Sequence, residues 1–584
     1  WDYNIGYNLS KSLKLNFRAA NKHIYDSFER LDDTEAEDIT LYSNFFNFGR
    51  VNNYSQKLEA SYKLPIDKLP FMKFVSSDYN YTANFDWSAG SQSFINEMGN
   101  AIQNANTHSL SNNLNMQKLY SEIRLKRLFT PKKKRPKPIV KDGKPKFASS
   151  ANRKVGSKKK KTTQERILNI AYDLITAVKN VRFSYSENNG TFLPGYKQSV
   201  GFLGRDNVGG GLAPTLGFVF GSQTDIRQLA LQNNWLTTRN INFLNQAQDT
   251  VSDPYYSKLY TNTHNNKLDI TVSVKPIKDL DIAINANRLR AMNSSQQIDP
   301  VKDYSDTSLV GGDYTLQFES TQLLEISNFS MSYSMFKTAF DGNGDTTFNK
   351  FIANRNIIKS RLATESGLDS EKYGLNSQDV LLPAFTAAYS GTNASNEKLS
   401  PFKKIPLPNW RVTYKGFMKI PLFKKNFSSF VISHAYKSSY TIGNMTNNAQ
   451  YSESPLGIPS LDMNNNYNSK VIVSSIVLND AFSPLVKVDM KLKNSLSFRG
   501  EISKDRALAM SFNNNSLSDI RGTEYIFGLG YRIKDLKMRI GGPRKKTMKG
   551  DLNMKADISY RQNLTTIRTV DTNDTQITGG QKIF

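Results

Sequence analysis

Alternation of apolar and polar residues over long segments constrains this chain more than any other feature of its sequence. In NWRVTYKGFMKI (409–420) apolar and aromatic residues take nearly every second position, and SSFVISHAYKSSYTI (428–442) and VSSDYNYTANFDW (75–87) do the same. A period of two places alternate side chains on opposite faces of an extended strand. The pattern recurs at 267–275 and 280–287, so we expect an all-β protein.

The length of these segments favours a membrane sheet over a soluble one. Strands of globular proteins have a modal length of about five to six residues, whereas these segments alternate for roughly 9–15, which suits a tilted strand that crosses a bilayer. Some connections are short and rich in Pro or Lys, such as KLPIDKLP (63–70) and VKPIKDL (274–280), and others are long and polar. We therefore predict part of a large transmembrane antiparallel β-barrel, with long loops, a few short helices and roughly 14–18 strands in this segment. The alternative is a large soluble β-sandwich or solenoid.

The barrel hypothesis assigns the two faces of each strand. The apolar face meets lipid, and the face rich in Ser, Thr, Asn, Asp and Lys lines a wet lumen. Aromatic residues near strand ends, such as Tyr79, Tyr81 and Trp87, are typical of the girdles at the membrane interfaces. The strand residues expected to face lipid are Trp410, Val412, Tyr414, Phe430, Ile432 and Tyr436.

Short turns lie on the periplasmic side of such barrels, which orients the first strands. From the turn at 64–70 the strand 75–87 rises, a partly helical loop follows near 88–112, and the chain returns through 114–129. The segment 163–178 has helical spacing, and a capping-box pattern (Thr162 with Glu165) marks its start. The segment thus predicts a helix at the periplasmic end of the next strand.

Three segments complete the expected organisation. The strand 181–188 rises again, and 197–262 is a long loop, extracellular or lumenal, whose Gly-rich stretch 204–221 we expect to be mobile and to line or constrict the lumen. The first ten residues are already strand-like and lack the features of a signal peptide. We expect residues 1–584 to form part of one transmembrane barrel domain, toward the C-terminal end of a longer protein.

A basic segment stands out at 128–162, which we expect to be a periplasmic loop inserted between strands. Lysine-rich segments bind phosphate backbones, but recognition modules add a folded groove reader or aromatic platforms, and the only aromatic residue between Pro131 and Lys161 is Phe147. We therefore expect no nucleic-acid partner; the open alternatives are anionic lipid headgroups, an acidic periplasmic partner, or a solvated loop without a partner. Its cations include Lys132, Lys133, Lys134, Arg135, Lys137, Lys158, Lys159, Lys160 and Lys161.

The sequence offers little catalytic or metal-binding chemistry. It contains no Cys and four His, and we find no nucleophile elbow, paired carboxylates or phosphate-binding loop, so we expect neither an enzyme nor a cofactor. DGNGDTTFNK starts like a calcium loop, with Asp341, Asn343 and Asp345 at alternate positions. Thr346 then replaces the expected Gly and Ile352 the bidentate Glu, so these residues are a weak calcium candidate and more typical of a polar turn.

Several stretches resemble the SprA/Sov family, the outer-membrane translocons of the type IX secretion system and of gliding motility. The similar stretches are VRFSYSENNGTFLPGY (181–196), VLLPAFTAAYSG (380–391), PFKKIPLPNWRVTYKG (401–416), EYIFGLGYRIKDLKMRIGG (524–542), DLNMKADISYRQNLTTIRT (551–569) and TQITGGQKIF (575–584). They follow family order along the whole chain, and the lysine-rich segment departs most from the family.

The resemblance implies a function that the alternation alone does not. It implies a protein-conducting channel that exports folded cargo from the periplasm to the cell surface. Implied partners are cargo with a C-terminal sorting domain, a PorV-type barrel at a lateral opening, a periplasmic plug protein, and the lipid and lipopolysaccharide of the outer membrane. The alternatives are a large outer-membrane uptake barrel and a soluble all-β surface adhesin.

Overall fold

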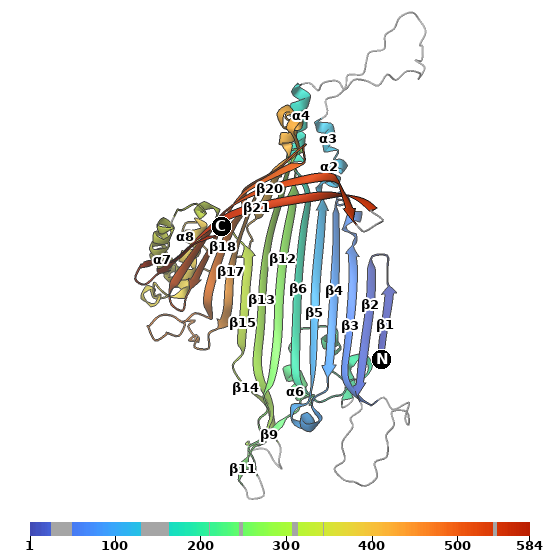
Figure 1. Cartoon of the computed structure of the whole chain (residues 1–584). Helices are drawn as coiled ribbons and strands as arrows, with labels where there is room; N and C mark the ends of the chain where they lie inside the picture. Colours follow the sequence, from blue (N-terminus) through green and yellow to red (C-terminus); the bar gives the residue numbers. More distant parts are fainter. Residues whose placement is uncertain are drawn as a thin grey trace, which may run out of the picture.

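The computed structural model describes residues 1–24, 49–129, 163–208, 211–244, 249–305, 314–342, 344–540 and 546–583. They form an all-β protein built on one sheet of 18 strands, which curves through space as a broad wall (Figure 1). Among the described residues, no helix is both long enough and apolar enough to cross a bilayer.

The sheet is an antiparallel meander in which most strands pair with their neighbours in sequence. Within the described part of the chain, β1 pairs only with β2 and β22 only with β21, so the sheet is open. The one parallel pairing joins β9 to β13. The long strands are β1 (Asp2–Asn8), β2 (Leu13–Ile24), β3 (Arg50–Leu64), β4 (Val75–Ser88), β5 (Asn100–Asn115), β6 (Val178–Tyr196), β12 (Lys258–Val274), β13 (Leu280–Asp303), β17 (Phe427–Asn447), β18 (Val471–Leu492), β19 (Leu496–Ser511), β20 (Ser516–Ile540), β21 (Lys546–Thr569) and β22 (Thr575–Ile583).

Shorter elements lie between these strands. The short strands of the main sheet are β9 (Arg239–Ile241), β14 (Thr315–Ser320), β15 (Leu324–Ser332) and β16 (Asn409–Tyr414), and two small hairpins comprise β7 (Asp206–Val208), β8 (Gly211–Ala213), β10 (Phe243–Leu244) and β11 (Thr250–Val251). The helices are α1 (Ile95–Met98), α2 (Met116–Glu122), α3 (Leu125–Leu128), α4 (Thr163–Ile175), α5 (Leu216–Val219), α6 (Arg227–Gln232), α7 (Asp345–Ser366), α8 (Gln378–Ser390) and α9 (Pro421–Asn426).

One position of the sheet is shared by two strands that the sequence separates widely. Both β15 and β16 pair with β13 on one side and with β17 on the other. The chain leaves the sheet after Ser332, forms a helical unit at 333–408 that contains α7 and α8, and returns at Asn409. We call this unit the helical insert.

Hydrogen bonds hold the exit and the return together. Tyr333 N donates to Ser438 O (3.1 Å), and Leu407 N donates to Ser332 O (3.0 Å). The buried Asn409 side chain accepts from Ser438 N (2.7 Å), which takes the place of a missing ladder bond. The wall therefore stays continuous although the strand is interrupted.

The structure confirms the main sequence predictions. The predicted strands at 75–87, 181–188, 280–287 and 428–442 lie within β4, β6, β13 and β17, and the one at 267–275 matches the end of β12 except for its last residue. The predicted helix starts at Thr163 as expected and ends at Ile175, slightly before the predicted limit. The number of strands in the main sheet also agrees with the expected range.

Two predicted strands were wrong. The return strand is 100–115 rather than 114–129, because 116–128 forms α2 and α3. The strand expected at 409–420 ends at Tyr414, where a 3-10 turn (Gly416–Lys419) and α9 begin the connection to β17. In both cases the apolar residues that were expected to extend the strand lie instead in short helical segments at its end.

The junction gives a first prediction. Asn409→Ala removes the acceptor of Ser438 N and leaves a buried N–H unpaired, which should lower the free energy of unfolding by about 1–3 kcal/mol. Asn293→Ala, at an exposed position of β13, is the matched control and should have little effect. Urea unfolding in detergent micelles measures both variants; equal midpoints would contradict the proposed role of Asn409.

Candidate functional site

The pairing register gives the sheet two chemically different faces. Residues directly opposite each other in an antiparallel pair lie on the same face. Asn84 of β4, for example, lies opposite Lys57 of β3, whereas the adjacent Phe85 lies opposite Gln56. The polar face of β4 carries Ser76, Asp78, Asn80, Thr82, Asn84 and Asp86, and its apolar face carries Val75, Tyr79, Tyr81, Ala83, Phe85 and Trp87.

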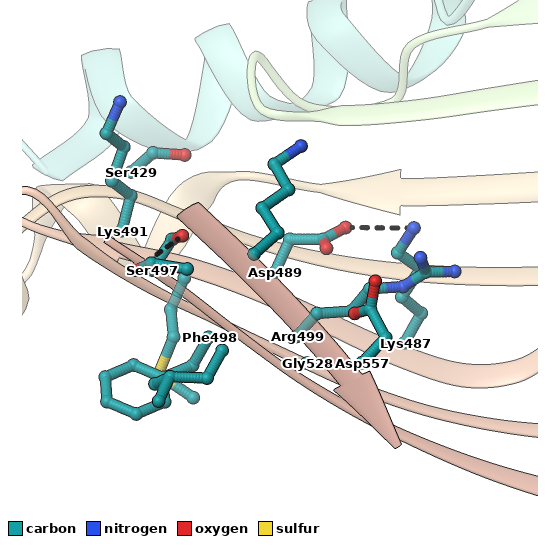
Figure 2. A pocket seen from close by; sticks show the side chains of 13 residues that line it. Ser429, Lys487, Asp489, Lys491, Ser497, Phe498, Arg499, Gly528 and Asp557 are labelled. Carbon is teal, nitrogen blue, oxygen red and sulfur yellow. Dashed lines mark hydrogen bonds and ion pairs between the residues drawn. The ribbon is translucent and has the colours of Figure 1, made fainter. Parts of the chain in front are cut away.

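A charged groove of about 300 Å³ lies on the polar face of β17–β21. In Figure 2, Lys487, Asp489 and Lys491 of β18 point to the same side of the sheet as Arg499 of β19, and Phe498 points to the opposite side. The side chains that line the groove include four cations and two carboxylates: Lys487, Lys491, Arg499, Lys555, Asp489 and Asp557. We take this groove and the wall around it as the candidate functional site.

Glycines of β20 make room for the charged side chains of its neighbours. On the polar face, a Cβ at Gly528 would overlap Asp557 Oδ1, and a Cβ at Gly530 would lie 2.5 Å from Ser497 Oγ. At Gly522 the missing side chain lets Arg561 of β21 reach over β20 to Asp505 of β19. Their Nη2–Oδ1 distance is 2.9 Å. Side chains two strands apart therefore meet across the glycine positions.

Two cations of the groove pair with carboxylates of the same wall. Arg499 Nη2 lies 2.5 Å from Glu501 Oε2, and Lys487 Nζ lies 3.4 Å from Asp489 Oδ2. Within the described ranges, no three or more His, Cys, Asp or Glu side chains converge to hold a metal ion. The arrangement suits a hydrated, weakly binding surface more than a site that holds one ion or small molecule.

The opposite face of the same strands carries exposed apolar side chains near the end of the short turns. Phe527 is 56% exposed and Ile558 is 72% exposed. Together with Val486, Ile502, Tyr525 and Tyr560 they line one shallow apolar hollow. The charged groove and the apolar hollow therefore lie back to back on the same stretch of these strands, since Asp557 lines the groove and its neighbour Ile558 lines the hollow.

Toward the end of the long loops, protein covers the apolar face. The helical insert packs on β15 and β17–β20, where Phe329, Tyr440, Leu478 and Leu508 are buried. Across β3–β6 the cover is formed by the described residues of the segment 198–223, namely 198–208 and 211–223. The long loop predicted at 197–262 is slightly shorter in the structure, because β12 already begins at Lys258.

The covering segment 198–223 is held by polar side chains of the apolar face. Gln56 Nε2 donates to Val219 O (3.2 Å), Asn104 Nδ2 to Phe218 O (2.8 Å) and Asn106 Nδ2 to Gly221 O (2.6 Å). Phe218 and Val219 are almost fully buried. The Gly-rich stretch therefore packs on the face opposite to the groove, and its place at the lumen stays a prediction.

A buried ion-pair network fixes the helical insert to the wall. Asp519 of β20 is 1% exposed and pairs with Arg506 of β19 (2.8 Å) and with Arg521 (2.7 Å). Both arginines also reach Asp341 of the insert, at 3.3 and 3.0 Å. Burial of these charges is costly in itself, and it is tolerated here because the insert supplies Asp341 as a second carboxylate for both arginines.

The same network accounts for part of the weak calcium candidate. Asp341 pairs with Arg506 and Arg521, and Asp345 Oδ1 lies 2.9 Å from Arg568 Nη2. Asn343 lies outside the described residues. The two described carboxylates pair with arginines and lie in the turn that leads into α7, which is the role of a structural turn.

Two aromatic clusters lie along β17 on the apolar side. Near the short turns, Phe430 contacts Phe417 and Phe423 with ring centroids 5.3 and 4.8 Å apart. Near the insert, Tyr436 contacts Phe482 at 4.9 Å. Phe427 belongs to the first cluster through its contacts with Phe423 and Phe430. It precedes Tyr436 by nine residues, one of which is taken up by the bulge between Phe427 and Ser429, so the clusters lie about 27 Å apart along the strand, or about 21 Å along the membrane normal at a tilt of about 40°.

The residues predicted to face lipid divide accordingly. Five of them are partly exposed on the apolar face: Trp410, Val412, Tyr414, Phe430 and Ile432. Tyr436 was placed wrongly, since it is 1% exposed and packs under Phe336 and Phe482. The cations predicted between Lys132 and Lys161 all lie outside the described residues, so the role of the basic loop stays a prediction.

Comparisons with known proteins return similar structures but no family. No family model and no curated protein matches the chain. The structures found include the copper transporter OprC (5% identity, 95% of this chain, 55% of that chain, TM-score 0.27) and the outer-membrane transporter YddB from Escherichia coli (5% identity, 100% of this chain, 73% of that chain, TM-score 0.22). The ferric-catecholate import receptor Fiu from E. coli K12 is also similar (6% identity, 100% of this chain, 70% of that chain, TM-score 0.22). The chain spans about half the length of OprC.

The ion-pair network yields a second prediction. Asp519→Ala removes the carboxylate that Arg506 and Arg521 share. The loss leaves buried positive charge without its partner and should destabilise the packing of the insert by about 3–5 kcal/mol. Asp505→Ala breaks the half-exposed pair with Arg561 and should cost less than about 1 kcal/mol. Limited proteolysis across 333–408 should therefore accelerate in the first variant only; equal rates would show that the network does not hold the insert.

Proposed function

We propose that this chain forms part of the wall of an outer-membrane channel that exports folded proteins. The observation that carries the proposal is the opposite chemistry of the two faces, maintained by the register across the strands. In the proposed arrangement the polar face with the charged groove borders the water-filled lumen, and the apolar face borders lipid. The short turns then lie at the periplasmic side and the long loops at the cell surface.

The apolar face supports the membrane part of the proposal. By pairing register its exposed side chains lie between the two aromatic clusters of β17, whose spacing of about 21 Å approaches the roughly 25 Å apolar band of membrane barrels. Beyond that band, the insert and the segment 198–223 cover the face and bring charged and polar side chains with them. Such a change from exposed apolar to covered polar chemistry fits the upper boundary of a bilayer.

The polar face supports conduction of a large, folded cargo. Part of its charge is paired within the wall, as Arg499 is with Glu501 and Arg561 with Asp505, and paired charges hold passing polypeptide weakly. An apolar lumen would instead bind exposed hydrophobic surface of the cargo. The open sheet of 18 strands is broad, and the diameter of a barrel grows with its number of strands.

The resemblance to the SprA/Sov family makes the cargo and partners specific. We infer cargo with a C-terminal sorting domain, delivery to a PorV-type barrel at a lateral opening, a periplasmic plug protein that closes the empty pore, and contact with outer-membrane lipid and lipopolysaccharide. The role is that of a transporter and not of an enzyme. Uptake of a small solute is the competing function, and an exported reporter separates the two.

Cysteine labelling tests the placement of the faces. Because residues 1–584 contain no Cys, single-cysteine variants need no background mutations within this segment. In lipid vesicles, Lys491→Cys and Asp557→Cys should react with a water-soluble maleimide at least about tenfold faster than Phe527→Cys and Ile558→Cys, since lipid shields the apolar face. All four positions should react in denaturant. Equal rates in vesicles would indicate a soluble adhesin.

Crosslinking during export tests the cargo. A photo-reactive residue at Lys491 or Asp557 should capture a folded reporter that carries a C-terminal sorting domain, and the same residue at Phe527 should not. The experiment uses the complete protein in cells that secrete the reporter. Capture at neither groove position, together with uptake of a small solute by the same cells, would support the import alternative.

A further inference from the structure

The connections at the short-turn end of the sheet are cationic and apolar at once. They comprise 65–74, 116–129 with 163–177, 275–279, 415–426 and 493–495, which we call the short-turn rim. Hydrogen bonds join neighbouring connections: Lys275 N donates to Ala177 O, Lys415 N to Asp279 O, and Lys493 N to Asn426 O. The rim is therefore one continuous edge, at the end where α2, α3 and α4 lie in Figure 1.

Apolar side chains of the rim are exposed. Leu128 is 77% exposed, and Phe71 is 78% exposed. Helix α4 turns Ile167, Ile170 and Leu174 outward at helical spacing, each more than half exposed. Its opposite side is anchored, because Tyr172 contacts Phe129 with ring centroids 6.0 Å apart. Exposure of these apolar side chains to water is unfavourable, and such a patch is typical of a surface that binds a partner or a membrane.

Cations accompany these apolar side chains along the rim. They include Lys68, Lys73, Lys118, Arg124, Arg127, Lys275, Lys278, Lys415, Lys424, Lys425 and Lys493, against few carboxylates. The carboxylate Asp279 is itself paired with Lys419. Apolar residues interleaved with cations are the signature of helices that lie in a membrane interface next to anionic headgroups.

We propose that the short-turn rim binds anionic phospholipid of the adjacent leaflet, with α4 lying in the interface and Arg124 and Arg127 contacting headgroup phosphates. The proposal rests on the proposed membrane location. Lipid is favoured over an acidic protein because the rim follows the edge of the wall whose apolar face is exposed, so that one bilayer covers both surfaces. An acidic partner would cover cations but leave Ile167, Ile170 and Leu174 in water.

Brominated lipids test this binding in the full-length protein. An environment-sensitive fluorophore on Ile170→Cys should be quenched by brominated phosphatidylglycerol several-fold more than by brominated phosphatidylcholine in mixed vesicles. The double variant Arg124→Gln with Arg127→Gln should reduce this preference about tenfold or more, at roughly a factor of five per removed cation. Asn169→Cys, on the other side of α4, is the control and should stay poorly quenched.

The outcomes distinguish this inference from the proposed function. If Phe527→Cys is quenched by both lipids and Ile170→Cys by neither, the wall lies in a membrane but the rim does not bind lipid, and the inference is wrong. If Ile170→Cys is protected only by an added acidic protein, the rim serves a protein partner and the inference is also wrong. If neither position is quenched, the membrane location itself fails.

Discussion

The antiparallel ladder is the constraint on which the rest of this wall depends. Because the side-chain period of a strand is two, a slip of one residue in any pair would move charged residues to the apolar face and apolar residues to the polar face. The register avoids this even where bulges interrupt it, as between Ser433 and Lys437 of β17. A single hydrogen-bond pattern thus keeps the charged groove and the apolar hollow on opposite faces of the sheet.

Where the ladder is interrupted between β15 and β16, the inserted residues pack on the apolar face of the sheet. The helical insert leaves and re-enters between β13 and β17, and backbone and Asn409 hydrogen bonds close the gap. The insert and the segment 198–223 both pack on the apolar face, near the long loops. They allow Arg506, Asp519, Asn104 and Asn106 to occupy positions that would otherwise require apolar residues.

Sequence periodicity predicts the parts of the fold that depend on local alternation. The strands at 75–87 and 428–442 and helix α4 follow from it directly. Strand β5 was missed because Asn104 and Asn106 replace apolar residues, and only the distant segment 198–223 explains their burial. Tyr436 was misplaced for the same kind of reason, since its cover comes from Phe336 of the insert. The groove had a usable signal: Gly522, Gly528 and Gly530 share one face of β20, which marks a place where neighbouring side chains cross the strand.

A density map of the complete protein in a lipid nanodisc tests the central claim most directly. The account predicts lipid density against Val486, Phe527 and Ile558, and an open aqueous space beyond Arg499 and Asp557 that is wide enough for a folded domain. A narrow lumen filled by side chains would contradict conduction of folded cargo. Lipid against the charged groove, or protein packed over the apolar hollow at bilayer height, would contradict the assignment of the two faces.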